Sequence, residues 1–131
     1  MSDKSTLSQF GHVFQSKIIS SLLSDKKFIQ TISDILEHEY FDSDANKWIC
    51  NEIREYFFEY KTPPTLEVMK VKIDEMENEV LQVSVVENLK ESWRNVKSTD
   101  LKFVQEQTLE FCKNQVMKQA IMNSVDLIEV G

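Results

Sequence analysis

Glycine and proline are scarce in this sequence, which has two of each in 131 residues. Folds with many strands need turn residues about every ten positions, so the scarcity favours long helices joined by short connections. The phosphate loops of most nucleotide-binding folds are excluded too, because they need clustered glycines. With 41% hydrophobic and 28% charged residues, the chain is typical of one globular, all-α domain with its own core.

Basic stripes and long apolar runs are also lacking, and there are only two cysteines. The net charge of −7 disfavours binding of this chain alone to nucleic acid, and suits solubility or docking to a basic partner. Cys50 and Cys112 lie far apart in helical apolar patterns, which favours reduced thiols near a core. A disulfide would need a secretory signal, and the polar start of the chain shows none. No run approaches the roughly 18 apolar residues of a membrane helix, so we expect a cytoplasmic protein.

No catalytic, cofactor-binding or metal-binding residue is assigned from the sequence. The only histidines are His12 and His38, and the side chains of Glu37-His38-Glu39 would point apart on a helix, whereas metal ligands must converge. Asp42 and Asp44 lie where a helix N-terminus favours negative charge, so capping explains them better than acid–base catalysis.

Apolar residues at three- and four-residue spacing predict six helices. The first is expected at about 8–23, and the second from a cap at Ser24 or Asp25 to about His38. The other four are expected at about 44–60, 66–77, 79–96 and 101–130. A short strand is the alternative for residues 80–86, because that run also alternates with period two. Residues 97–100 form a polar break before the last helix.

The segment from Tyr40 to Leu66 contains a cap, an aromatic helix, a proline stop and a second cap. Asp42 or Ser43 can cap the aromatic helix, Pro63-Pro64 ends it, and Thr65 can cap the next one. Aromatic residues can stack on nucleic-acid bases, but such platforms accompany positive grooves. This helix carries glutamates instead, so its aromatic face is expected to pack in a core.

The last helix is much longer than the average helix of globular proteins. A helix of this length cannot bury all of itself against a small head, so part of it should project and contact another chain. We expect a helical head at 1–77 and an antiparallel helical hairpin at 78–131 within the same domain. Gly131 directly after the helix is typical of a domain boundary.

Three segments carry a resemblance to a known family. The first is FQSKIISSLLSDKKFIQTI, an opening helix that runs into a Leu-Leu-x-Asp turn. The second joins Tyr40-Phe41 and Lys47-Trp48-Ile49 to the aromatic helix and the Pro64-Thr65-Leu66 start. The third is FVQEQTLEFCKNQVMKQAIMNSVDLIEVG. Together they resemble the N-terminal domain of DnaB-type replicative DNA helicases, most closely the versions in tailed phages.

The resemblance implies a non-catalytic collar domain that supports assembly of a ring-shaped helicase and recruits primase in the phage or host cytoplasm. The RecA-like ATPase motor would follow the linker after this module and is absent from this sequence. Self-association through the hairpin is expected, as a dimer or a larger assembly. The candidate residues for hairpin packing and subunit contacts are Trp93, Val104, Phe111, Met117, Ile121, Val125 and Ile128.

Two other classes of protein remain open. One is a free-standing phage adaptor or assembly protein, which a stop codon after Gly131 would favour. The other is a small helical enzyme or DNA-binding regulator, which would need a convergent polar pocket or a basic face.

Overall fold

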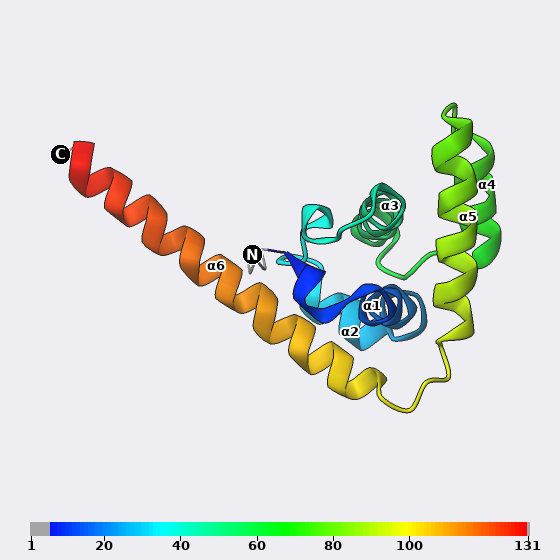
Figure 1. Ribbon diagram of the computed structural model, residues 1–131, viewed down its shortest axis with the longest axis horizontal. Helices are drawn as coiled ribbons and strands as arrows, with labels where there is room; N and C mark the ends of the chain where they lie inside the picture. Colours follow the sequence, from blue (N-terminus) through cyan, green and yellow to red (C-terminus); the bar gives the residue numbers. More distant parts are fainter. Residues whose placement is uncertain (1–5, 131) are drawn as a thin grey trace.

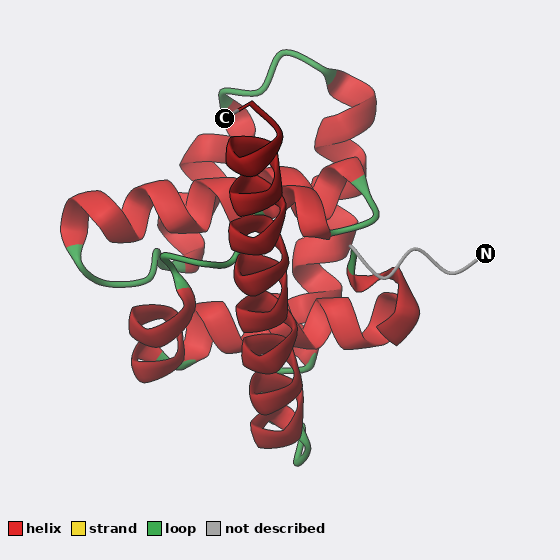
Figure 2. Cartoon of the chain, turned by 90° about the vertical axis from the view of Figure 1, so that its left-hand side faces the viewer, coloured by secondary structure: helices red, strands yellow, loops and turns green. Residues whose placement is uncertain are grey.

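The computed structural model describes residues 6–130, and the side chains of residues 6–125. Its α-helices are α1 (His12–Ser24), α2 (Lys26–Ile32), α3 (Asp44–Tyr60), α4 (Leu66–Asp74), α5 (Glu79–Arg94) and α6 (Leu101–Val130), with two short 3-10 helices at Leu7–Phe10 and His38–Tyr40 (Figure 1). Among the described residues there is no strand (Figure 2), and residues 80–86 belong to α5. The predicted all-α class is confirmed, and the alternative of a strand at 80–86 is wrong.

Side-chain caps fix the starts of the middle helices. Asp25 accepts hydrogen bonds from the amides of the first turn of α2, Ser43 accepts one from the amide of Asn46 at 3.1 Å, and Thr65 accepts one from the amide of Val68 at 3.3 Å. Lys61 ends α3 in the left-handed conformation (φ 62°), just before the two prolines. The bounds predicted for α3, 44–60, and for α6, 101–130, agree with the structure.

The first predicted helix is divided at Gly11. This glycine has φ 85° and ψ 172°, a conformation open to glycine and strained for other residues, so the short helix at Leu7–Phe10 and α1 meet at an angle. Gln15 holds the junction: its side-chain amide donates to the carbonyls of Leu7 and Gly11 and to Asp42 Oδ2, at 3.3, 3.2 and 2.9 Å.

The second predicted helix ends early, at Ile32 rather than near His38. Arg54 of α3 donates from Nε to the carbonyl of Ser33 at 3.0 Å, which satisfies a helix-end carbonyl from outside the helix. The chain then turns so that Leu36 becomes fully buried. The sequence pattern predicts a further helical turn here, but the chain instead leaves the helix, because this buries Leu36 and allows Arg54 to bind the carbonyl of Ser33.

Helix α1 lies at the centre of the molecule and contacts α2, α3, α5 and α6. Its apolar residues Ile18, Ile19 and Leu22 are fully buried. Where α1 crosses α5, the small residues Ser20 and Ser92 are also fully buried, and the hydroxyl of Ser20 donates to the carbonyl of Ser92. Small side chains allow the two helix backbones to approach closely.

The antiparallel hairpin predicted for residues 78–131 is not confirmed. After the link at 95–100, α6 leaves in a different direction from α5, and the two helices do not run along each other within the described residues (Figure 1). Helix α5 packs on α1, α3 and α4, whereas the first half of α6 packs on α1 and α2. Both helices use their apolar faces on the head, on separate sides of it, so neither face is left for the other.

Candidate functional site

The predicted interface residues fall into three places in the structure. Val104 and Phe111 are buried in the head, with 1% and 5% of their surface exposed. Trp93 is on α5, while Met117, Ile121 and Val125 lie on the exposed part of α6. The side chain of Ile128 lies outside the described residues.

Phe111 anchors the first half of α6 to the head. Its ring meets the ring of Tyr40 edge-on at 5.2 Å and the ring of Phe10 edge-on at 6.2 Å between centroids. The next residue, Cys112, is fully buried. Two polar contacts fix the same half of the helix: Lys17 pairs with Asp100 at 2.7 Å, just before α6, and the Gln105 amide donates to Asp25 Oδ2 at 3.2 Å.

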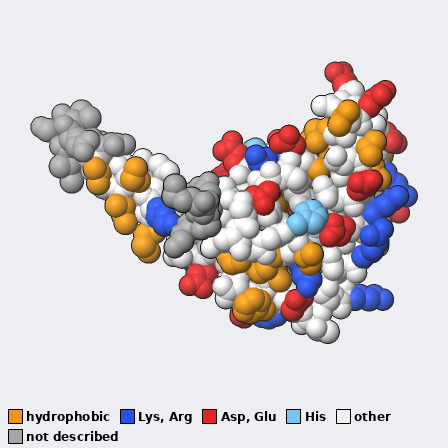
Figure 3. Space-filling model, viewed as in Figure 1, with side chains coloured by type: hydrophobic (Ala, Val, Ile, Leu, Met, Phe, Trp, Pro, Cys, Tyr) orange, Lys and Arg blue, Asp and Glu red, His pale blue; other side chains and the backbone are white. Residues whose placement is uncertain are grey.

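The second half of α6 leaves the head. Every side chain from Val116 to Val125 is exposed, and Figures 1 and 3 show this half of the helix extending away from the rest of the molecule. At 1.5 Å per residue the part beyond Cys112 is about 27 Å long. The predicted projection of the last helix is therefore confirmed.

This projecting half carries an apolar face, which we call the α6 face. Met117, Ile121 and Val125 follow one another at four-residue spacing, which places them on one side of the helix. Met122 borders this side of the helix, and the exposed fractions of the four side chains range from 44 to 62%. Exposed apolar surface of this kind, concentrated on one segment, is typical of a protein–protein contact.

Trp93 belongs to a different surface, which lies between α4 and α5. It is 45% exposed and borders a groove of about 390 Å³ together with apolar side chains of both helices. Two contacts hold the helices around this groove: Lys72 of α4 pairs with Glu52 of α3 at 3.1 Å, and the Gln82 amide of α5 donates to the carbonyl of Ile73 at 2.8 Å. Sequence reasoning assigned Trp93 to the same contact region as the α6 residues, and the structure separates them.

The two cysteines are buried and chemically quiet. Cys50 and Cys112 are free, buried thiols, and burial raises the pKa of each to about 12, which keeps them protonated and unreactive at neutral pH. Burial also raises the pKa of the Tyr40 hydroxyl. Within the described part of the chain no cluster of His, Cys, Asp and Glu side chains could hold a metal ion.

Over the same residues, every helix falls short of the length or the apolar character that a membrane span requires. No protein-family model, curated protein or solved structure matches this chain.

Proposed function

We propose that this chain is a non-catalytic helical assembly module that self-associates through the α6 face. The observation that carries the proposal is the run of exposed side chains from Val116 to Val125, on a helix whose first half is anchored in the head. A docked first half holds the second half in a fixed direction, so that its apolar face is presented to a second copy at little further entropic cost.

The strength of this association follows from the exposed side chains. Fully burying a Val, Ile or Met side chain contributes about 1.5–3 kcal/mol, so covering the remaining half of each contributes about 1 kcal/mol. Four such residues in each of two copies give roughly 6–12 kcal/mol before the cost of association, which is itself about 4–15 kcal/mol. When the cost of association is near the low end of that range, the balance reaches the roughly 6 kcal/mol that association at tens of micromolar requires.

In its biological setting, we propose, the module is the N-terminal collar domain of a DnaB-type replicative helicase, where it supports ring assembly and primase recruitment. The support is the sequence resemblance over its three segments, together with an all-helical head that carries a long exposed helix. In that family the helices after the head form a paired hairpin, so this reading requires α5 and α6 to rearrange or α6 to find its partner in another segment or subunit. A free-standing phage adaptor would use the same α6 face.

Sedimentation velocity over a range of concentrations tests the self-association. The chain is expected to form a dimer or larger species at tens of micromolar, and the double variant Met117→Glu/Ile121→Glu is expected to remain monomeric. The matched control is Val71→Glu/Val80→Glu, which places two glutamates on exposed valines of α4 and α5 and should associate like the wild type. A strictly monomeric wild-type chain would contradict the proposal.

The replication role needs a separate measurement. Titration of the chain into purified primase from the same source should show binding by calorimetry. Self-association without any primase binding would leave the assembly role and remove the primase role.

A further inference from the structure

The groove between α4 and α5 has an apolar floor. Five side chains from the two helices form it: Leu66, Ile73, Val86, Leu89 and Trp93. A second hollow of about 450 Å³, against the turn at 62–67 and the end of α1, shares Leu66 and Trp93 with the first. Trp93 therefore lies between two adjoining hollows and is about half exposed. Tryptophan is enriched among the residues that contribute most of the binding energy at protein interfaces.

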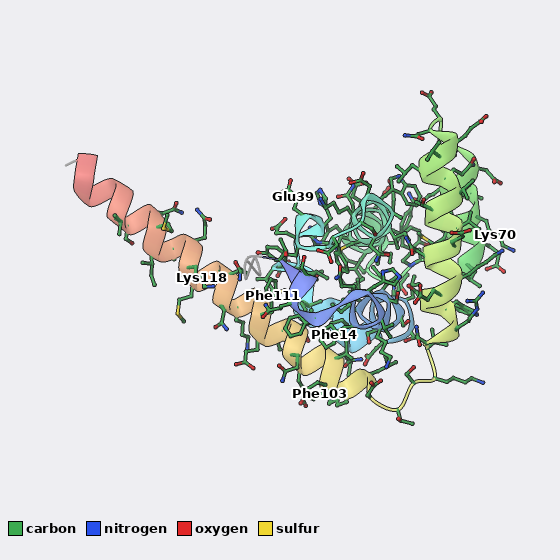
Figure 4. All side chains as sticks on the ribbon, viewed as in Figure 1. Phe14, Glu39, Lys70, Phe103, Phe111 and Lys118 are labelled. Carbon is green, nitrogen blue, oxygen red and sulfur yellow. The ribbon has the colours of Figure 1, made fainter. Side chains whose placement is uncertain are left out.

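The rim of the groove is basic, although the chain as a whole is acidic. Lys70, Lys90 and Arg94 border the groove against one carboxylate, Asp74, in a chain whose net charge is −7. Figure 3 shows Lys and Arg side chains gathered on the right-hand edge, and Figure 4 places Lys70 on the outer side of the α4–α5 pair. The groove thus has a local charge opposite to that of the molecule.

These three cations are available for a partner. Within the described residues, three Lys and Arg side chains form ion pairs with carboxylates of the chain, those of Lys17, Arg54 and Lys72. Lys70, Lys90 and Arg94 are among those that make no ion pair or side-chain hydrogen bond there. A partner with carboxylates would gain three charge-assisted contacts without breaking any.

We infer that this groove binds an acidic amphipathic helix of another protein. The nine residues of α4 extend for about 13 Å, which matches two to three turns of a bound helix. Apolar side chains at three- and four-residue spacing on such a helix would fill the floor around Trp93, and carboxylates on its flanks would meet the basic rim. Nucleic acid fits less well, because the floor is apolar and Asp74 interrupts the positive charge. The inference goes beyond self-association and uses no residue of α6.

A designed peptide provides the probe for the full 131-residue chain. It is a helical peptide of about three turns with leucines at three- and four-residue spacing and glutamates on the flanks, labelled for fluorescence anisotropy. The expected Kd is micromolar, and binding should weaken as salt is raised. The same peptide with lysines in place of the glutamates is expected not to bind.

Two variants of the chain locate the site. Lys90→Glu/Arg94→Glu should weaken binding about tenfold or more, and Trp93→Ala should weaken it about thirtyfold. Lys90 and Arg94 are exposed, so the helical circular dichroism spectrum and the melting temperature of the charge variant should stay close to those of the wild type. Trp93 is 45% exposed, so Trp93→Ala also loses buried surface and should melt at a lower temperature, and a helical circular dichroism spectrum at the temperature of the binding assay shows that it is folded. The matched control is Lys27→Glu/Lys102→Glu, which makes the same charge change beside a different hollow, between α2 and α6, and should leave binding within about twofold.

Four results would overturn the inference. They are absence of peptide binding up to millimolar concentration, equal binding of the lysine peptide, equal weakening by the control variant, and loss of self-association in Lys90→Glu/Arg94→Glu. The last result would show that the groove is covered by a second copy of this chain rather than by an acidic partner.

Discussion

Phe111 is the largest buried side chain in the first half of α6, and replacing it with alanine should weaken the attachment of that half to the head. Phe111 is 5% exposed and packs edge-on against Tyr40 and Phe10. Phe→Ala in a core costs about 3–5 kcal/mol through lost burial and the cavity left behind. That is a large share of the roughly 5–15 kcal/mol that stabilises a domain of this kind.

Thermal unfolding followed by circular dichroism measures this loss. At about 4 °C per kcal/mol for a chain of this size, Phe111→Ala should lower the melting temperature by roughly 12–20 °C. The matched control is Met122→Ala, on the exposed half of the same helix, where truncation should change stability by no more than about 0.5 kcal/mol. Both substitutions are made in the Met117→Glu/Ile121→Glu variant, so that self-association does not add to the measured stability.

A second observable separates release of the helix from general destabilisation. In the background variant, amides in the first half of α6 should exchange with solvent slowly and those beyond Cys112 quickly, because only the first half is buried. Phe111→Ala should bring the first half close to the rate of the second. If Phe111→Ala cost no more than Met122→Ala, the packing of α6 on the head described here would be wrong.

Two further predictions concern the backbone at Gly11 and the buried thiols. Gly11→Ala should lower the free energy of unfolding, measured with denaturant, by about 1–3 kcal/mol. The cost comes from the positive φ alone, since no atom lies within 4 Å of an added Cβ. An unchanged free energy of unfolding would mean that Gly11 does not adopt this backbone conformation. Cys50 and Cys112 should react with a thiol reagent at pH 8 only on unfolding. The pKa of each thiol is near 9 in the unfolded chain and about 12 in the folded one. Between those pH values the unfolded chain therefore binds fewer protons than the folded chain. The free energy of unfolding should consequently fall above pH 9 by about 1.4 kcal/mol per pH unit for each thiol. Denaturant midpoints at pH 8 and pH 10, compared with those of Cys50→Ala/Cys112→Ala, measure this; equal pH dependence in the two proteins would contradict it.

The local signals in the sequence were sufficient for most helix bounds. Ser43 and the Pro63-Pro64 pair mark both ends of α3, and the polar break at 97–100 precedes a continuous helical pattern that becomes α6. The second helix was predicted too long because its end is set by Arg54, a residue 21 positions beyond the carbonyl that it binds. A pattern within one helix carries no information about such a contact.

The arrangement of the helices was less predictable than their bounds. A helical pattern shows which face of α5 or α6 is apolar, but not which element covers it. The apolar pattern therefore places Val104 and Phe111 among the candidates for hairpin packing and subunit contacts, whereas the structure buries them in the head. The α4–α5 groove has one trace in the sequence, the four-residue spacing of Lys90 and Arg94 around Trp93, and its other wall depends on how α4 lies against α5.

The two surfaces differ in physical character, which allows them to be separated in one sample. The α6 face is apolar and projects on one side of the molecule, whereas the groove lies on the opposite side and has a basic rim (Figures 1 and 3). Apolar contacts keep or gain strength as salt rises, while contacts between exposed charges are screened within about 8–10 Å. Raising the salt concentration should therefore release an acidic peptide while leaving the self-associated form intact. Parallel loss of both would mean that the two contacts share one surface, since independent surfaces with different driving forces cannot respond alike.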